Sequence, residues 1–321
     1  MTTPQPLLEV EDLVKHHHTP AGAVRAVDGV SFAIQRGETL GFVGESGCGK
    51  STLGRTLMRL HEPDAGTIRF EQRDVTRLGR REMRPVRRNV QMIFQDPYGS
   101  LNPRRTVRQL LTEPFQVHGI GDGADRRERV GELLERVGLH PDHAERHPHE
   151  FSGGQRQRIA IARAIALEPR LVICDEPVSA LDVSIQAQII NLLRRLQRES
   201  GMAYLFISHD LSVVGYVADR IAVMYLGQIV EIAPKVELWR EPLHPYTRVL
   251  FSAIPLPSPP SQTRRERLAL KGEPPSPIAP PRGCRFHTRC PHAMPVCREQ
   301  TPALREVEGG RQVACHLVGA A

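Results

Sequence analysis

Eight residues near the N-terminus have the types and the spacing of a phosphate-binding loop: Gly44, Glu45, Ser46, Gly47, Cys48, Gly49, Lys50 and Ser51. Glycines in such a loop let backbone N–H groups approach phosphate oxygens, and the helix that follows presents its positive N-terminus to the same anion. The lysine reaches the β- and γ-phosphates, and the serine hydroxyl coordinates Mg²⁺. We therefore expect these residues and Thr52 to bind a nucleotide, with Ser51 as a magnesium ligand.

Two adjacent carboxylates follow the apolar run of residues 171–174, which is typical of a buried strand. Because Asp175 and Glu176 leave the same strand end, they can divide the work of hydrolysis. Asp175 would hold the magnesium shell, and Glu176 would orient and deprotonate the attacking water. The alternative is a pair of residues that caps a helix N-terminus.

A second phosphate contact is predicted at Ser152, Gly153, Gly154 and Gln155. Ser152 is expected to cap a helix that begins at Gly153. The free N–H groups and the positive dipole at such a helix start favour an anion.

The elements that must position these residues alternate between strand-like and helix-like patterns from residue 7 to about residue 237. Short apolar runs predict strands at 39–43, 171–174 and 204–207, and helical periodicity predicts helices at 126–137 and 184–199. A further helix is expected at 52–60, after the phosphate loop and before the stop near Pro63. Alternation of this kind indicates an α/β fold. We expect one nucleotide-binding domain at residues 1–238.

The remaining residues, 239–321, are predicted to form a small extension rich in proline and cysteine. Proline density predicts an extended connector at about 255–283, followed by a four-cysteine module at 284–316. Cys284, Cys290, Cys297 and Cys315 suit either Zn²⁺ or an iron–sulfur cluster, although the paired Cys-x-x-Cys knuckle of structural zinc sites is missing. Four free thiols are the alternative, because buried reduced cysteine is common.

We expect the chain to be made and kept in the cytosol. The N-terminus has no basic stretch followed by an apolar segment, and no apolar run approaches the roughly 20 residues that span a bilayer. The six cysteines should therefore be thiols or metal ligands rather than disulfides. Any action at a membrane must proceed through partners. The net charge of +7 does not by itself select a ligand.

Taken together, residues 44–51, residues 151–155 and the Asp175–Glu176 pair resemble the ATPase domain of ATP-binding cassette (ABC) proteins. The resemblance implies an ABC-type P-loop nucleotide-binding domain with a helical subdomain, and ATP and Mg²⁺ as cofactors. It also implies that residues 152–155 face the γ-phosphate bound by another subunit, so that two domains enclose two ATP molecules.

Further positions match family motifs one by one. Gln95 matches the glutamine that touches magnesium and water and links the site to the membrane partner, so it joins Ser51 and Asp175 as a magnesium contact. His209 matches the switch histidine at the γ-phosphate, and Asp182 matches the loop that couples the two sites. His17 falls where the family stacks an aromatic ring on adenine, but the His16–His18 triplet also suits a solvated turn or an adventitious metal site.

Residues 94–103, 175–188 and 244–247 resemble the ATP-binding subunits of bacterial dipeptide/oligopeptide importers, specifically the second ATPase subunit of the pair. This implies a heterodimer with a second ABC ATPase, two transmembrane permease subunits, an extracytoplasmic substrate-binding protein and a peripheral position on the cytoplasmic face of the inner membrane. It also favours a [4Fe-4S] cluster over zinc at the four cysteines. Nickel or another small solute remains an alternative cargo.

The competing class is a soluble ABC ATPase that acts on nucleic acid or ribosomes. Arginines at 77, 80, 81, 84, 87 and 88 favour it, since such a cluster can neutralise phosphates. No aromatic residues interleave with these arginines to stack on bases. We therefore interpret the cluster as a solvated face and expect no nucleic-acid partner.

Overall fold

The structure is a computed structural model that describes residues 5–252 and 272–319, apart from the side chains of residues 97 and 98. The chain forms two compact units, each assembled from separate stretches of sequence. Among the described residues, unit 1 contains 35–38 and 77–207, and unit 2 contains the rest. The domain boundary predicted between residues 238 and 239 stays a prediction.

Unit 1 is built on a parallel sheet in which β7 lies between β6 and β8. Each strand is largely apolar and its side chains are almost all buried, as expected for a parallel sheet covered on both faces. The elements are α2 (Arg80–Asn89), β6 (Val90–Ile93), α3 (Pro97–Ser100), α4 (Val107–His118), α5 (Gly123–Arg136), the 3₁₀ helices η1 (Pro141–Glu145) and η2 (Pro148–Glu150), α6 (Gly153–Ile165), β7 (Leu171–Asp175), α7 (Val183–Ser200) and β8 (Ala203–Ile207).

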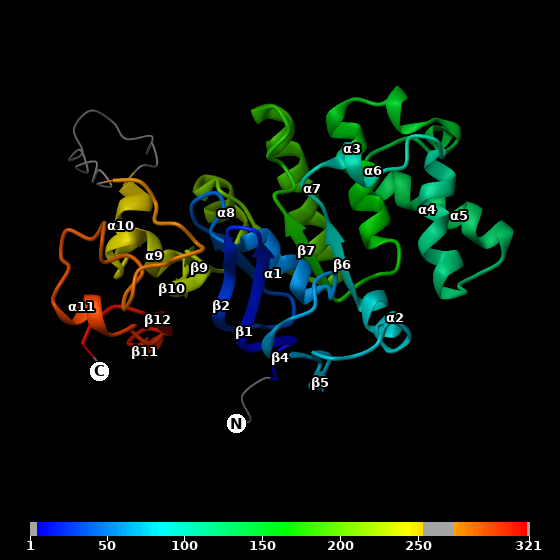
Figure 1. Ribbon diagram of the computed structural model, residues 1–321. Helices are drawn as coiled ribbons and strands as arrows, with labels where there is room; N and C mark the ends of the chain where they lie inside the picture. The colour runs from blue at the N-terminus through cyan, green and yellow to red at the C-terminus, as the bar shows by residue number, and fades with distance from the viewer. Residues whose placement is uncertain (1–4, 253–271, 320–321) are drawn as a thin grey trace, which may run out of the picture. The chain divides into compact units, whose positions relative to one another are not determined.

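Helices α6 and α7 begin directly after Ser152 and Asp182, two residues predicted to act at the nucleotide site. Helix α6 packs against β6 and α7, and α4 and α5 form a helical group beside it (Figure 1). The inward face of α7 carries Ile189, Leu192, Leu193 and Leu196, which recur at helical spacing and are all buried. Helix α7 ends at Gly201, which has a φ of 68° that favours glycine.

Unit 2 contains two sheets. An antiparallel sheet has the order β2-β1-β4-β5, and a mixed sheet in this unit has the order β11-β12-β10-β9-β3, with β3 and β9 parallel. The elements are β1 (Leu8–Thr19), β2 (Gly22–Ile34), β3 (Thr39–Val43), α1 (Lys50–Leu57), β4 (Ala65–Phe70), β5 (Arg73–Asp74), α8 (Leu211–Val217), β9 (Arg220–Tyr225), β10 (Gln228–Pro234), α9 (Lys235–Arg240), α10 (Pro245–Ser252), α11 (Val296–Glu299), β11 (Arg305–Val307) and β12 (Arg311–Val313).

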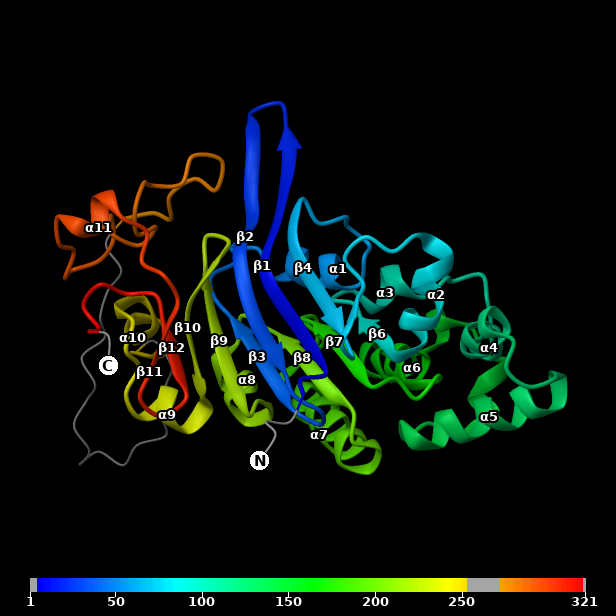
Figure 2. The same cartoon turned by 90° about the horizontal axis from the view of Figure 1, so that it is seen from below.

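The C-terminal extension lies against the β9–β10 hairpin within unit 2. Strand β12 pairs with β10, and Figure 2 shows α10, α11, β11 and β12 gathered on that side of the unit. The backbone N–H of Arg25 in β2 donates to the carbonyl of Pro277 at 3.1 Å. Residues 272–283 contain no helix or strand, and the rest of the predicted connector, 255–271, lies outside the described residues. Backbone hydrogen bonds thus join the extension to the rest of unit 2 at two places.

The α/β fold and the strands predicted at 39–43, 171–174 and 204–207 are confirmed. Five of the six clustered arginines are exposed, and Arg87 is half-buried, which agrees with a largely solvated face. The helix predicted at 52–60 was wrong at its C-terminal end, because α1 stops at Leu57 and Arg59 adopts a left-handed φ of 53°. No helix in the described ranges is both long and apolar enough to cross a membrane.

Candidate nucleotide site

The phosphate loop (residues 44–51) connects β3 to α1 in unit 2. Its backbone comes so close to its neighbours that side chains are excluded at two positions: a Cβ on Gly44 would lie 2.1 Å from the carbonyl oxygen of Met224, and one on Gly49 would lie 1.8 Å from that of Ala26. Both glycines also have positive φ, 153° and 110°. Only glycine therefore allows this loop to seat between β2 and the end of β9.

Lys50 lies at the start of α1 and is buried, with 5% of its surface exposed. Its ammonium group donates to the carbonyl oxygens of Gly44 at 2.7 Å and Glu45 at 3.0 Å, which holds the charge at the centre of the loop. The first turn of α1 contains no acidic residue. The lysine charge and the uncompensated helix N-terminus both favour an anion, so the loop fits a nucleotide phosphate.

Two histidines lie near this loop in unit 2. His17 on β1 has its Nε2 atom 3.4 Å from the hydroxyl of Thr52, and its ring meets that of His61 edge-on with centroids 5.2 Å apart. His209 is exposed and follows Ser208, whose N–H donates to the carbonyl of Phe42 in β3 at 3.1 Å. The adenine role of His17 and the γ-phosphate role of His209 remain predictions.

In unit 1, β7 ends at Asp175, which is completely buried, and Glu176 turns the chain with a left-handed φ of 47°. The Glu176 N–H donates to the carbonyl of Ile207 at the end of β8, at 2.9 Å. The side-chain amide of Gln95 donates to the Glu176 carboxylate, also at 2.9 Å. The structure thus brings together Gln95 and Glu176, which were predicted from separate motifs.

The helix start at Ser152 has the capping arrangement predicted from the sequence. The Ser152 hydroxyl accepts from the N–H of Gln155 at 3.3 Å, and the Gln155 side chain accepts from the N–H of Ser152 at 3.0 Å. A Cβ on Gly154 would lie 2.6 Å from a methyl group of Ile185, so glycine allows α6 to approach α7. Asp182 is exposed and precedes α7 without capping it through its side chain. The phosphate and coupling roles of these residues remain predictions.

Two residues that contact the phosphate loop were missed by the sequence analysis. Tyr246 accepts a hydrogen bond from the Glu45 N–H at 3.0 Å, and Arg289 pairs with the Glu45 carboxylate at 3.0 Å. Tyr246 lies in residues 244–247, which resembled the importer subunits but suggested no role for this tyrosine. Arg289 had no signal, since it is one arginine among many.

The four cysteines of the extension are close enough for their charges to interact. Burial raises the pKa of Cys284 to about 11, opposed by a backbone hydrogen bond from Phe286, and negative charge on Cys290, Cys297 or Cys315 would raise it further. However, no group of three or more histidine, cysteine or acidic side chains in the described ranges is arranged to hold a metal ion. The predicted metal centre therefore lacks a preformed single-ion site.

Comparison with known proteins agrees with the geometry of both units. The family model described as ABC transporter matches residues 27–179. A second model, described as oligopeptide/dipeptide transporter, C-terminal region, matches residues 230–297. The chain is 57% identical over 314 residues to the putative oligopeptide transport ATP-binding protein YkfD of Bacillus subtilis, covering 97% of this chain and 95% of that protein.

The chain belongs to the ABC transporter family. It is also 56% identical over 319 residues to the oligopeptide transport ATP-binding protein AppF of Bacillus subtilis, covering 97% of each chain. Among solved structures, the dimeric post-hydrolysis state of the ATP-binding cassette MJ0796 bound to ADP and Pi matches with a TM-score of 0.65 and 29% identity. That match covers 71% of this chain and 98% of the other. Members of this family are ATPases that use ATP and Mg²⁺, so the predicted enzyme class and fold are confirmed.

Proposed function

We propose that this chain is an ATP-hydrolysing subunit that powers import of di- or oligopeptides across the cytoplasmic membrane. The observation that carries the proposal is the union of two features in one chain: a cassette with a complete phosphate loop, and the C-terminal region that marks oligopeptide and dipeptide transporters. The relatives named for oligopeptide transport match along nearly their whole length, which supports peptides over nickel or another solute as cargo.

Within the subunit, Lys50 and the loop N–H groups would bind the phosphates of ATP. The Ser51 hydroxyl, the Asp175 carboxylate and the Gln95 amide supply oxygen donors of the kind Mg²⁺ prefers. A magnesium ion held there would supply positive charge against the charge that develops on the phosphates. Glu176, held by Gln95, would take the proton of the attacking water, and His209 would sense the γ-phosphate.

The active assembly in this proposal has two ATPase subunits. Residues 152–155 and Asp182 would act on ATP held by the partner ATPase, so that a single chain is incomplete. We propose a heterodimer with a second ABC ATPase, bound to two permease subunits at the cytoplasmic face of the membrane and served by an extracytoplasmic substrate-binding protein.

Reconstitution tests this proposal. The chain, its partner ATPase and both permeases are placed in proteoliposomes with the binding protein, and uptake of a labelled peptide is measured alongside phosphate release. We expect ATP-dependent uptake, and a much lower ATPase rate for the chain alone, shown to be monomeric by light scattering. An equal rate for the lone monomer would refute the composite site, whereas stimulation by RNA or ribosomes without peptide uptake would favour the soluble alternative.

We propose separately that Cys284, Cys290, Cys297 and Cys315 bind one metal centre, a [4Fe-4S] cluster in preference to Zn²⁺. A backbone hydrogen bond from the Cys284 N–H to the Cys297 carbonyl, at 2.8 Å, supports the proximity of two of these residues. A zinc site needs four ligand atoms about 2.0–2.3 Å from one ion, and no such set is preformed in the described ranges. Iron, sulfide and zinc analysis after anaerobic purification distinguishes the two metals, and absence of all three would leave four free thiols.

A further inference from the structure

The C-terminal extension reaches the phosphate loop through an anchor segment (residues 284–290). Phe286 in this segment is 1% exposed, and two arginines, Arg285 after Cys284 and Arg289 before Cys290, are 7% and 8% exposed. Arginine is seldom buried unless its charge is paired, because removing it from water is costly. Both guanidinium groups should therefore have specific partners within unit 2.

Arg289 has its partner on the phosphate loop itself. One guanidinium nitrogen donates to both carboxylate oxygens of Glu45, at 3.1 and 3.0 Å, and to the hydroxyl of Tyr225 at 3.4 Å. Burial lowers the pKa of Arg289, but the hydrogen bonds to Glu45 and Tyr225 outweigh burial and raise it. The ion pair therefore keeps Arg289 charged and holds it at the start of the loop.

Tyr246 holds the backbone of the same loop residue. Its hydroxyl accepts from the Glu45 N–H at 3.0 Å, so Glu45 is fixed through its main chain and its side chain at once. The rings of Tyr225, Tyr246 and Phe286 pack against one another with centroids 4.6 to 5.4 Å apart. This aromatic cluster joins the anchor segment, α10 and the end of β9 into one packed block behind the loop.

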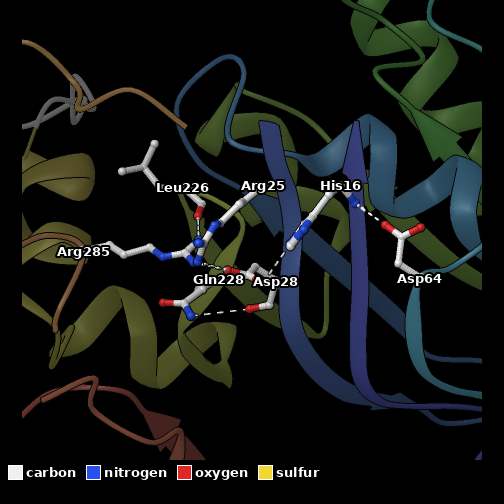
Figure 3. Close-up of polar contacts among 7 residues, drawn as sticks. All are labelled: His16, Arg25, Asp28, Asp64, Leu226, Gln228 and Arg285. Carbon is white, nitrogen blue, oxygen red and sulfur yellow. Dashed lines mark hydrogen bonds and ion pairs between the residues drawn. The ribbon is translucent and has the colours of Figure 1, made fainter. Parts of the chain in front are cut away.

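Arg285 provides a second connection through the β9–β10 turn. It donates to the carbonyl of Leu226 and to the carboxylate of Asp28, which also lies 2.9 Å from the Nε2 atom of His16 (Figure 3). The next residue, Gly227, donates its N–H to the carbonyl of Cys48 in the phosphate loop at 2.9 Å. Arg285 thus holds the β9–β10 turn, and Gly227 of that turn holds the phosphate loop at Cys48.

From these contacts we propose that Arg289 is a positioning residue for the phosphate loop and that the C-terminal extension thereby sets the affinity of this chain for ATP. Arg285 and Tyr246 support the same loop from two other directions. The inference goes beyond peptide import, because it concerns how nucleotide affinity depends on a region outside the ATPase motifs. It predicts that loosening the anchor segment weakens nucleotide binding even when the chain remains folded.

The test measures the Kd of the full-length chain for ATP with Mg²⁺ by isothermal titration calorimetry. We expect Arg289→Ala to raise the Kd about tenfold, within the range of roughly 5- to 150-fold typical of coupling between sites. Tyr246→Phe, which keeps the buried ring and removes only the hydroxyl, should raise it about two- to tenfold. Arg298→Ala is the matched control, since Arg298 is an exposed arginine of the same extension.

Two further measurements separate positioning from a merely structural role. Hydrogen exchange of residues 44–51 should accelerate in Arg289→Ala while the thermal midpoint falls little, and the charge-swapped double variant Arg289→Glu with Glu45→Arg should recover part of the lost affinity. An unchanged Kd in both Arg289→Ala and Tyr246→Phe would overturn the proposal. So would an equal loss in Arg298→Ala, or exchange that accelerates throughout unit 2.

Discussion

Replacing Glu176 with glutamine should abolish turnover while leaving ATP binding and the fold unchanged. The structure gives the physical basis: glutamine has the size of glutamate and can still accept the hydrogen bond from Gln95, which measures 2.9 Å. The backbone hydrogen bond from residue 176 to Ile207 does not involve the side chain. The substitution therefore removes only the ability to take a proton from water.

The size of the loss follows from that single change. A positioned general base contributes about 10²–10⁴ in rate. This corresponds to about 2.7–5.4 kcal/mol of barrier, at about 1.36 kcal/mol for each factor of ten. We expect the full assembly with Glu176→Gln to retain at most about 1% of the phosphate-release rate, with a Kd for ATP within about twofold of the unmodified protein.

Glu176→Gly tests the same reasoning from the side of stability. Residue 176 has a φ of 47°, and a left-handed conformation costs a non-glycine residue roughly 1–2 kcal/mol. Glycine removes that cost but loses more entropy on folding and gives up the contact with Gln95. We expect an inactive variant whose free energy of unfolding lies within about 1 kcal/mol of the original.

The assay is phosphate release by the assembled transporter, with ATP binding and urea unfolding measured on the same preparations. Glu168→Gln is the matched control, because Glu168 is an exposed glutamate with a comparable φ of 51° in the same unit. It should be fully active. Retention of more than about a tenth of the rate by Glu176→Gln would refute the general-base assignment.

Three further outcomes are expected. Phe286→Ala should lower the free energy of unfolding by about 3–5 kcal/mol in urea titration, because a ring that is 1% exposed is lost; Leu317→Ala, at a residue 44% exposed, should change it by less than about 0.5 kcal/mol. Ser152→Ala should cost about 1 kcal/mol by the same titration, since the cap on the N–H of Gln155 is removed. In metal-free protein, burial raises the pKa of Cys284 from 9.0 to about 11, so its contribution to the free energy of unfolding is present below pH 9 and is lost between pH 9 and 11. Labelling of this thiol by iodoacetamide, followed by mass spectrometry, should be slow at pH 8 and should accelerate over the same pH interval.

The elements that carry the motifs could be predicted because their signals are local. Strands β7 and β8 each contain a continuous apolar run, and a periodic apolar face marks α7. The cap at Ser152 depends on residues three apart in the sequence and was also predictable. In each case the interacting residues are chain neighbours, so the pattern contains the answer.

The end of α1 shows where local signals fail. The helix was expected to run from Thr52 to Leu60 and to stop near Pro63, yet Arg59 takes a left-handed conformation. Its guanidinium group donates to the carbonyl of Val75 at 2.9 Å, a contact between residues 16 positions apart. The N–H groups of Arg59 and Leu60 also donate to the carbonyls of Thr56 and Arg55, each at 2.9 Å, so a Schellman motif closes the helix without the glycine that usually marks one in the sequence.

The contacts between the extension and the phosphate loop could not be predicted, because they join residues far apart in the sequence. Arg289 and Glu45 are 244 residues apart, and Arg285 and Asp28 are 257 apart. A resemblance assigns roles to motif positions, and neither arginine lies in a motif that was recognised. The fold shows that these two arginines are buried, whereas other arginines of the extension are exposed.

The family comparison gives these contacts their meaning. Glu45 lies within the residues matched by the ABC transporter model, whereas Tyr246 and Arg289 lie within those matched by the C-terminal region of oligopeptide and dipeptide transporters. The cassette MJ0796 is 98% covered by a match that uses 71% of this chain, so a cassette can be built almost entirely without the remainder. We interpret the contacts of Tyr246 and Arg289 with Glu45 as positioning of the loop, because they join the regions matched by the two family models. Because Arg285 follows Cys284 and Arg289 precedes Cys290, we expect binding or modification of those thiols to affect the two arginines.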